Sequence, residues 1–131
     1  MTERPLSPHL SVYRMYRYTL LTSILNRATG LALSAGLILL VYWLVAIASG
    51  PAAYRGAREV LSLDVLKAVY VLLLGTFSYH FFAGIRHLIW DTGRGLERAQ
   101  SKRSAALVVI ASILLFVGLA WWALQAGARA P

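Results

Sequence analysis

The sequence contains no cysteine, and acidic side chains are scarce, with five Asp and Glu among 131 residues. A chain without thiols has no disulfide, no thiolate-held iron–sulfur cluster and no C-x-x-C-H attachment for a c-type haem. Charged residues make up 14% of the chain and hydrophobic residues 59%, whereas soluble domains are roughly a quarter charged and half apolar. The composition therefore indicates a membrane protein, and any redox group that it binds must be noncovalent and not thiolate-bound.

Three long apolar runs predict three transmembrane helices. The predicted spans are residues 22–49, 65–90 and 105–125. The first is anchored on the nineteen uncharged residues 31–49 and is closed by Gly50 and Pro51, and crossing a bilayer takes about 20 apolar residues. We therefore expect an all-α integral membrane domain over residues 1–131, an up-down-up bundle that follows an N-terminal segment of residues 1–21.

The positions of the basic residues predict the orientation of the bundle. The net charge is +8, but the Lys and Arg residues fall between the apolar runs, which indicates membrane topology and not nucleic-acid binding. Three spans place the N-terminus and the second loop on one side, with nine basic residues, against four on the other. The nine are Arg4, Arg14, Arg17, Arg27, Arg86, Arg94, Arg98, Lys102 and Arg103, and the four are Arg55, Arg58, Lys67 and Arg129. The positive-inside rule then predicts a cytoplasmic N-terminus.

One polar cluster lies at the start of the first span. Ser23, Asn26, Arg27 and Gly30 have i, i+3, i+4, i+7 spacing, which places them on one face of a helix. Ionisable side chains at membrane depth are costly and are functional candidates by default. A hydroxyl and a fixed cation can both hydrogen-bond the carbonyl of a small apolar ligand. Arg27 could equally be only a determinant of topology.

A second polar cluster lies in the second span. His80, Gly84 and His87 share a helical face, and His80 lies about 15 Å from the helix end, near the bilayer centre. A neutral imidazole there suits an iron ligand, and a glycine one turn away lets a flat macrocycle approach the backbone. His87 lies about 10 Å further along, too far to ligate the same iron but within reach of a haem propionate. Arg86 adds a cation for the same propionates. A six-coordinate haem b would then need its other axial ligand from another chain.

Structural alternatives exist for each of these residues. His80 can serve as an interhelical hydrogen-bonding histidine, and Arg86 and His87 can simply extend to the lipid headgroups. In a small transporter or channel subunit, His80 and Arg27 would line an ion path, and a scaffold would hold no cofactor. Gly36 and Gly118 are predicted to mark close helix packing.

Three segments resemble the cytochrome b subunit of succinate dehydrogenase in its alpha-proteobacterial and mitochondrial form. Residues 4–10 followed by Tyr13 are similar to the family's amino-terminal signature. Residues 23–30 are similar to its S-I-x-H-R-x-T-G motif. Residues 80–91, which read H-F-F-A-G-I-R-H-L-I-W-D, are similar to its H-x-x-x-G-x-R-H-L-x-x-D motif. Order, spacing and the three-span plan agree across most of the chain.

The resemblance implies a role for each matching residue. It implies that His80 is an axial ligand of haem b, with the opposite histidine supplied by a second small membrane-anchor subunit, and that His87 approaches the propionates. Ser23 and Arg27 would line a ubiquinone site. Asn26 stands where the family usually has a histidine near the propionates and the quinone. Asparagine still donates a hydrogen bond but carries no charge, which changes what this position can do.

The resemblance also implies the function of the chain. It describes a non-catalytic anchor of the succinate:quinone oxidoreductase complex, respiratory complex II, in which electrons from succinate reach ubiquinone through an iron–sulfur subunit. The expected partners are the flavoprotein subunit, the iron–sulfur subunit, the second anchor subunit and the lipid bilayer. The expected location is a bacterial inner membrane, with the mitochondrial inner membrane as the alternative. An anchor of a fumarate reductase is the nearest alternative function.

Overall fold

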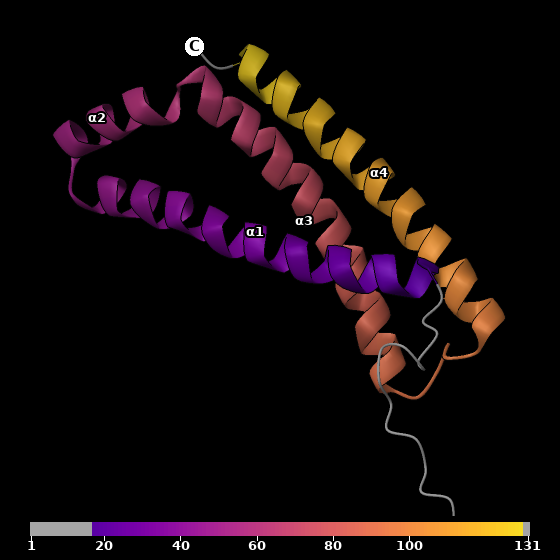
Figure 1. Ribbon diagram of the computed structural model, residues 1–131. Helices are drawn as coiled ribbons and strands as arrows, with labels where there is room; N and C mark the ends of the chain where they lie inside the picture. Colours follow the sequence, from indigo (N-terminus) through magenta and orange to yellow (C-terminus); the bar gives the residue numbers. More distant parts are fainter. Residues whose placement is uncertain (1–16, 130–131) are drawn as a thin grey trace, which may run out of the picture.

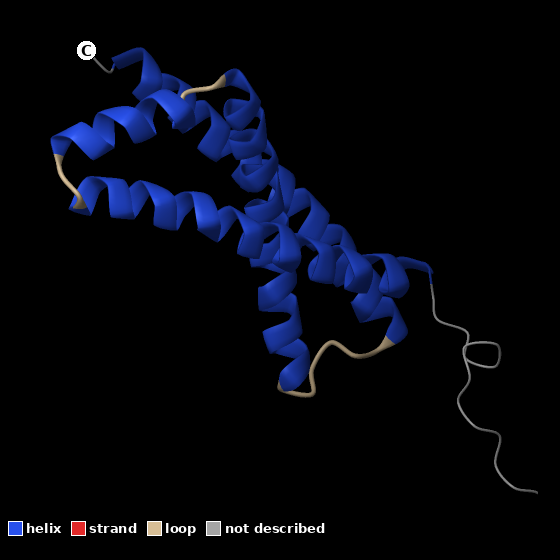
Figure 2. Cartoon of the chain, turned by 60° about the vertical axis from the view of Figure 1, so that its left-hand side comes forward, coloured by secondary structure: helices blue, strands red, loops and turns tan. Residues whose placement is uncertain are grey.

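The computed structural model describes residues 17–129, and this part of the chain is entirely helical between its turns (Figure 1, Figure 2). The helices are α1 (Arg17–Ala48), α2 (Pro51–Leu61), α3 (Asp64–Asp91) and α4 (Arg98–Arg129). The predicted N-terminal signature, residues 4–10 and Tyr13, lies outside the described residues. The all-α prediction is confirmed for the described chain.

Three of these helices are long and apolar enough to cross a membrane, as predicted. They are the stretches Leu20–Ala48, Asp64–Asp91 and Arg98–Ala128. At 1.5 Å per residue, even the 28 residues of α3 extend about 42 Å, more than the hydrocarbon core of about 30 Å. α4 begins at Arg98, before the predicted start of the third span at Ala105. The prediction missed these residues because the first two turns of α4 are polar, and hydropathy identifies only apolar segments.

The structure adds a short helix, α2, that the apolar runs did not predict. Gly50 has φ +99°, a conformation that favours glycine, and it separates α1 from α2. Pro51 stands in the first turn of α2, where its missing N–H costs no hydrogen bond. Only Ala57 is buried in α2, at 3% exposure, and the helix is too short and too polar to be recognised by hydropathy.

Two glycines with positive φ follow the end of α3. Thr92 caps the helix, and Gly93 and Gly95 follow with φ +77° and +76°. The indole Nε1 of Trp90 donates to the carbonyl of Gly95 at 3.1 Å, which closes the turn back on the helix. The chain then enters α4.

α3 is the central helix, and it runs antiparallel to both α1 and α4. Thr22 of α1 contacts Arg86 of α3, and Thr29, further along α1, contacts His80, which lies earlier in α3. The residue numbers rise along one helix as they fall along the other, so the two helices are antiparallel. α1 crosses α3 obliquely, and the two helices separate towards α2 (Figure 1). The up-down-up order of the three long helices is therefore the one expected.

The two glycines predicted to mark close packing differ in the structure. A Cβ added at Gly36 would lie 2.8 Å from the end of the Leu73 side chain, so α1 and α3 pack closely here and a larger residue would require Leu73 to move. A Cβ added at Gly118 would meet nothing within 4 Å in the described chain. Close packing is confirmed at Gly36, whereas Gly118 lies on an open face of α4.

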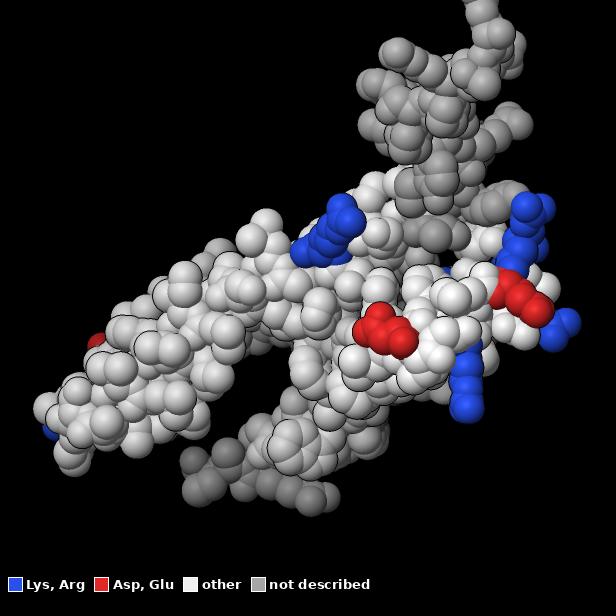
Figure 3. Space-filling view, turned by 90° about the horizontal axis from the view of Figure 1, so that it is seen from below, with Lys and Arg blue, Asp and Glu red and all other residues white. Residues whose placement is uncertain are grey.

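The interior of the bundle contains mostly small residues, both apolar and polar, and the large apolar side chains lie on its exterior. The buried residues are Ala46, Ala57, Ala83, Ala105, Val108, Ser78, Arg86, Ser101 and Ser112. Large side chains such as Leu31, Ile38 and Leu72 are at least 70% exposed. Small residues and hydroxyls between helices, with large apolar side chains outside, are typical of helices that pack in lipid. In the view of Figure 3, most charged side chains lie towards one end of the molecule, a few lie at the opposite edge, and much of the surface between them is uncharged.

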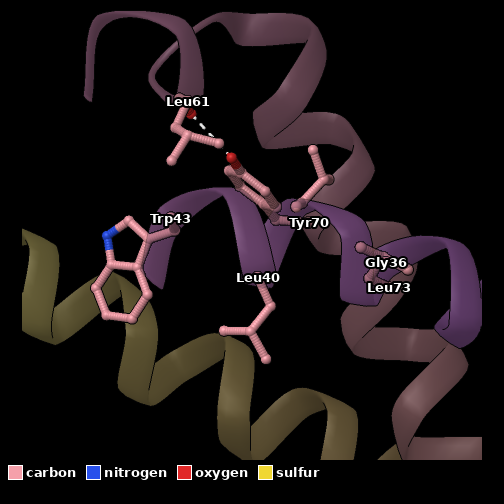
Figure 4. Close-up of a pocket in the computed structure, with 7 residues that line it drawn as sticks. Gly36, Leu40, Trp43, Leu61, Tyr70 and Leu73 are labelled. Atoms are coloured by element: carbon pink, nitrogen blue, oxygen red, sulfur yellow. Dashed lines mark hydrogen bonds between the residues drawn. The ribbon is translucent and has the colours of Figure 1, made fainter. Parts of the chain in front are cut away.

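The half of the bundle near α2 contains an apolar cavity of about 410 Å³ (Figure 4). Its lining is Gly36, Leu39, Leu40, Trp43, Leu61, Tyr70 and Leu73. The Tyr70 hydroxyl donates to the Leu61 carbonyl at 3.1 Å and so ties α3 to the end of α2. The lining has few polar groups that could orient a ligand, so this half of the bundle is a poor candidate for the functional site. The polar residues of the two predicted clusters lie in the other half.

Candidate functional site

His80 lies in the middle of α3, and its imidazole faces α1. Its Nδ1 is 3.1 Å from the Thr29 hydroxyl. A Cβ added at Gly30 would lie 3.2 Å from the His80 Cε1 atom, so the ring rests against the backbone of α1. The ring is half-buried. The interhelical contact that the sequence left as an alternative is therefore present, and it engages only one of the two ring nitrogens.

A cavity of about 580 Å³ lies between α1 and α3, with His80 in its wall. Its lining is Gly30, Leu33, Ser34, Gly36, Leu37, Leu40, Tyr70, Leu73, Leu74, Phe77 and His80. A Cβ added at Gly84, one turn beyond His80, would meet no described residue within 4 Å. The surroundings of His80 thus combine apolar walls with an open strip of α3 backbone, which a flat apolar group or a neighbouring helix can approach.

Arg86 is buried at 5% exposure and joins three helices. Its Nη1 donates to the Thr22 hydroxyl of α1 at 3.1 Å. On α4, its Nε donates to the Ser104 hydroxyl at 3.0 Å, and its Nη2 donates to the Ser101 carbonyl at 3.0 Å and hydroxyl at 3.2 Å. Its guanidinium carbon lies 3.9 Å from the centroid of the Trp90 ring. Arg86 therefore points into the bundle. The alternative in which its side chain extends to the lipid headgroups is wrong for this structure.

His87 is half-buried beside Trp90, with the ring centroids 5.3 Å apart. Its Nδ1 is 2.7 Å from the Ala83 carbonyl. A carbonyl only accepts, so Nδ1 must carry the hydrogen. The Nε2 atom then accepts a hydrogen bond when the ring is neutral and donates one when the ring is protonated, which means that only the protonated ring can donate to a carboxylate from Nε2.

The first-span cluster lies on α1 as predicted. Ser23 and Asn26 are half-buried and Arg27 is exposed. The Asn26 Oδ1 atom is inaccessible to solvent and has no hydrogen-bond partner among the described residues. A buried acceptor without a donor is costly, and no described residue supplies that donor.

The structure brings the two clusters into the same half of the bundle. Thr22 contacts Arg86, and the pair Thr29 and Gly30 contacts His80. Thr22, Thr29, Ser101 and Ser104 were not predicted from the sequence. Thr29 lies inside the first-span motif, and that position is the feature of the sequence that could have identified it. The two serines precede the predicted third span, and nothing in the sequence marked them as contacts of the site.

The donor set fits a haem iron better than a bare metal ion. Residues 17–129 contain no group of three or more His, Asp, Glu or Cys side chains that could hold a metal ion. A haem iron is already held by its macrocycle and takes single imidazoles as axial ligands. His80 fits that requirement, because it lines an apolar cavity, only its Nδ1 atom is hydrogen-bonded among the described residues, and Gly84 leaves open space one turn away. A second axial imidazole is not offered within the described chain, because His87 lies two turns away on the same helix.

These features define a class of protein: a three-span membrane subunit with a histidine at mid-span and basic side chains towards one end. A family model described as the succinate dehydrogenase/fumarate reductase transmembrane subunit matches residues 1–119. The chain belongs to this family. As a member of this family, it is a non-catalytic membrane-anchor subunit of the succinate dehydrogenase complex.

Named relatives agree with this assignment. The succinate dehydrogenase cytochrome b556 subunit of Paracoccus denitrificans is 40% identical over 114 residues, which cover 87% of each chain. The mitochondrial cytochrome b560 subunit of Sus scrofa is 39% identical over 124 residues, covering 91% of this chain and 71% of the relative. The cytochrome b556 subunit of Rickettsia prowazekii is 36% identical over 113 residues, covering 86% and 87%. The resemblance to the alpha-proteobacterial and mitochondrial type is confirmed.

Proposed function

We propose that the chain is the haem b- and quinone-binding anchor of a succinate:quinone oxidoreductase. The observation that carries the proposal is the His80 imidazole, held at mid-span with Nδ1 engaged by Thr29 and with Gly84 open beside it. The relatives are named cytochrome b subunits of succinate dehydrogenase, which supports haem b as the group that this imidazole binds. The second axial histidine comes from another small anchor subunit in this proposal.

The remaining site residues have assigned tasks in the proposal. A bound haem b would supply one-electron redox chemistry. His80 would hold the iron, and His87 would lie near a propionate, to which its Nε2 atom can donate when the ring is protonated. Arg86 stabilises the negative propionates from within the bundle, although its hydrogen bonds already tie three helices together. Asn26 would donate a hydrogen bond from its side-chain amide to a propionate or to the quinone.

The quinone site is proposed at Ser23 and Arg27. A hydroxyl and a guanidinium four residues apart on α1 can both donate to a quinone carbonyl. Arg27 is exposed in the single chain, so the second anchor subunit and the iron–sulfur subunit would cover it in the complex. The positive-inside rule places this end of the bundle in the cytoplasm of a bacterium, or in the matrix of a mitochondrion. The flavoprotein subunit oxidises succinate on the same side.

The haem assignment is tested by a reduced-minus-oxidised absorption spectrum of the purified complex. His80→Ala should abolish the b-type haem band of wild type. Phe81→Ala, the adjacent exposed position on α3, should keep it. A wild-type complex without haem, or a His80→Ala complex with its haem band unchanged, would contradict the proposal. Altered ion flux with an unchanged spectrum would favour a transporter subunit.

The quinone assignment is tested separately. Arg27→Ala should lower quinone reduction by about tenfold or more, since a charged hydrogen bond contributes about 1.5–3 kcal/mol. Succinate oxidation with a soluble acceptor should be unchanged, because that chemistry belongs to other subunits. Arg103→Ala, another exposed arginine, serves as the control for loss of surface charge. Normal quinone reduction by the Arg27→Ala complex would disprove the assignment.

A further inference from the structure

Thr29 is the residue that contacts the His80 ring nitrogen. Its Oγ1 lies 3.1 Å from the His80 Nδ1 atom. The same oxygen lies 2.7 Å from the carbonyl of Leu25 and 3.0 Å from the carbonyl of Asn26, both on its own helix. Three polar atoms therefore surround one hydroxyl group.

The protons of this group can be assigned by elimination. A threonine hydroxyl has one hydrogen, and a carbonyl oxygen only accepts. The shortest contact, to the Leu25 carbonyl, takes that hydrogen, as in other threonines that bond back to the preceding turn. The Thr29 oxygen then faces the imidazole with a lone pair, so the hydrogen in the contact must come from the His80 Nδ1 atom. A neutral ring that is protonated on Nδ1 has its lone pair on Nε2.

Gly30 limits the position of the same ring. A Cβ at residue 30 would lie 3.2 Å from Cε1, 3.8 Å from Nδ1 and 4.0 Å from Nε2. The edge of the ring that includes Nδ1 and Cε1 therefore rests against α1. The two adjacent residues act together, with one hydrogen-bonding the ring and the other giving it room.

We propose that Thr29 is a positioning residue for His80. It keeps the imidazole in the tautomer protonated on Nδ1 and fixes its rotation, so that Nε2 carries the lone pair that binds iron. This inference rests on the proposed function, because it concerns the ligand that His80 provides. Thr29 touches neither the iron nor the quinone in this proposal and acts only through the ring.

The inference predicts a change in the electronic properties of the haem. An acceptor on the far nitrogen makes a ligating imidazole more basic and orients it, which favours ferric over ferrous iron. Thr29→Val keeps the branched shape and removes the acceptor, so the haem midpoint potential should rise. A tenfold weaker preference for the ferric state corresponds to about 59 mV for a one-electron couple. Loss of such a partner commonly weakens metal binding by about 10–100-fold, so haem should also be lost more readily.

The test is a redox titration of the haem in the purified complex, with haem retention measured during detergent washing. Thr29→Val should raise the midpoint potential and lower retention severalfold. Thr29→Ser restores the hydroxyl and should resemble wild type in both measurements. Wild-type values for Thr29→Val, or a Thr29→Ser complex that matches Thr29→Val, would overturn the inference.

The result is separable from the proposed function. If wild type contains haem, His80→Ala loses it and Thr29→Val is unchanged in potential and retention, only the role of Thr29 is wrong. If wild type contains no haem, or His80→Ala keeps it, the proposed function itself fails.

Discussion

Replacing Arg86 by alanine should weaken the bundle, because this side chain joins α1, α3 and α4. Its four hydrogen bonds to Thr22, Ser101 and Ser104 are all interhelical. Such bonds average about 0.6 kcal/mol in a membrane protein, and a cation–π contact adds about 0.5–1 kcal/mol. The expected loss is therefore about 3 kcal/mol in the free energy of unfolding.

The structure indicates why the loss should not be much larger. The Thr22 hydroxyl donates to the Tyr18 carbonyl at 3.0 Å, and the Ser104 hydroxyl donates to the Ser101 carbonyl at 3.0 Å. Both hydroxyls keep these bonds on their own helices when Arg86 is removed. The Thr22 and Ser104 donors therefore stay satisfied, which limits the penalty of a buried polar group without a partner to the Ser101 hydroxyl, whose contact with Arg86 is lost.

The assay is SDS-induced unfolding of the purified complex, with haem content recorded in the same samples. Arg103→Ala, on the exposed side of α4, is the matched control and should change stability by less than about 0.5 kcal/mol. Ser104→Ala should cost about 0.6 kcal/mol, and a double-mutant cycle with Arg86→Ala should show that the two effects are not additive. Equal stability of the Arg86→Ala and Arg103→Ala complexes would refute the reasoning.

Three glycine substitutions give further predictions. Gly36→Ala should cost about 1–3 kcal/mol in SDS unfolding, because the new Cβ would lie 2.8 Å from Leu73, and Leu73→Ala in the same chain should recover part of the loss. Gly30→Ala should displace the His80 ring and change the haem midpoint potential, and an unchanged potential would show that the ring tolerates the methyl group. The new methyl group of Gly84→Ala would contact none of residues 17–129, so we expect it to act on what packs there in the complex and to reduce haem retention or binding of the second anchor subunit, and normal values for both would show that neither uses this strip of α3.

The apolar runs alone predicted the spans, their order and the residues that end them. Hydropathy over about 20 residues is a local property of the chain, and the requirement to satisfy backbone groups in lipid leaves helices as the solution for these runs. Gly50 and Pro51 were recognisable as the end of the first span, because this pair does not readily continue a helix. α2 and the first turns of α4 were not, since polar helices give no such signal.

Both polar clusters were recognisable from helical spacing and from the cost of placing ionisable groups in a membrane. Spacing within one helix defines a face, but it does not show which other helix that face meets. The partners of His80 and Arg86, namely Thr29 and the hydroxyls of Thr22, Ser101 and Ser104, became evident only when the helices were packed. Hydroxyl residues are common in transmembrane helices, and their sequence positions do not distinguish a partner from a neighbour that bonds only to its own backbone.

The sequence by itself determined that this chain is a three-span membrane subunit with one deep histidine, because these properties depend on local hydropathy and on helical periodicity. Only the tertiary structure decided which nitrogen of that histidine is engaged and that Arg86 is directed inward. Both depend on the antiparallel register of α1 and α4 against α3, which is set by close approach at positions such as Gly36 and Gly30 and not by any single segment of the chain.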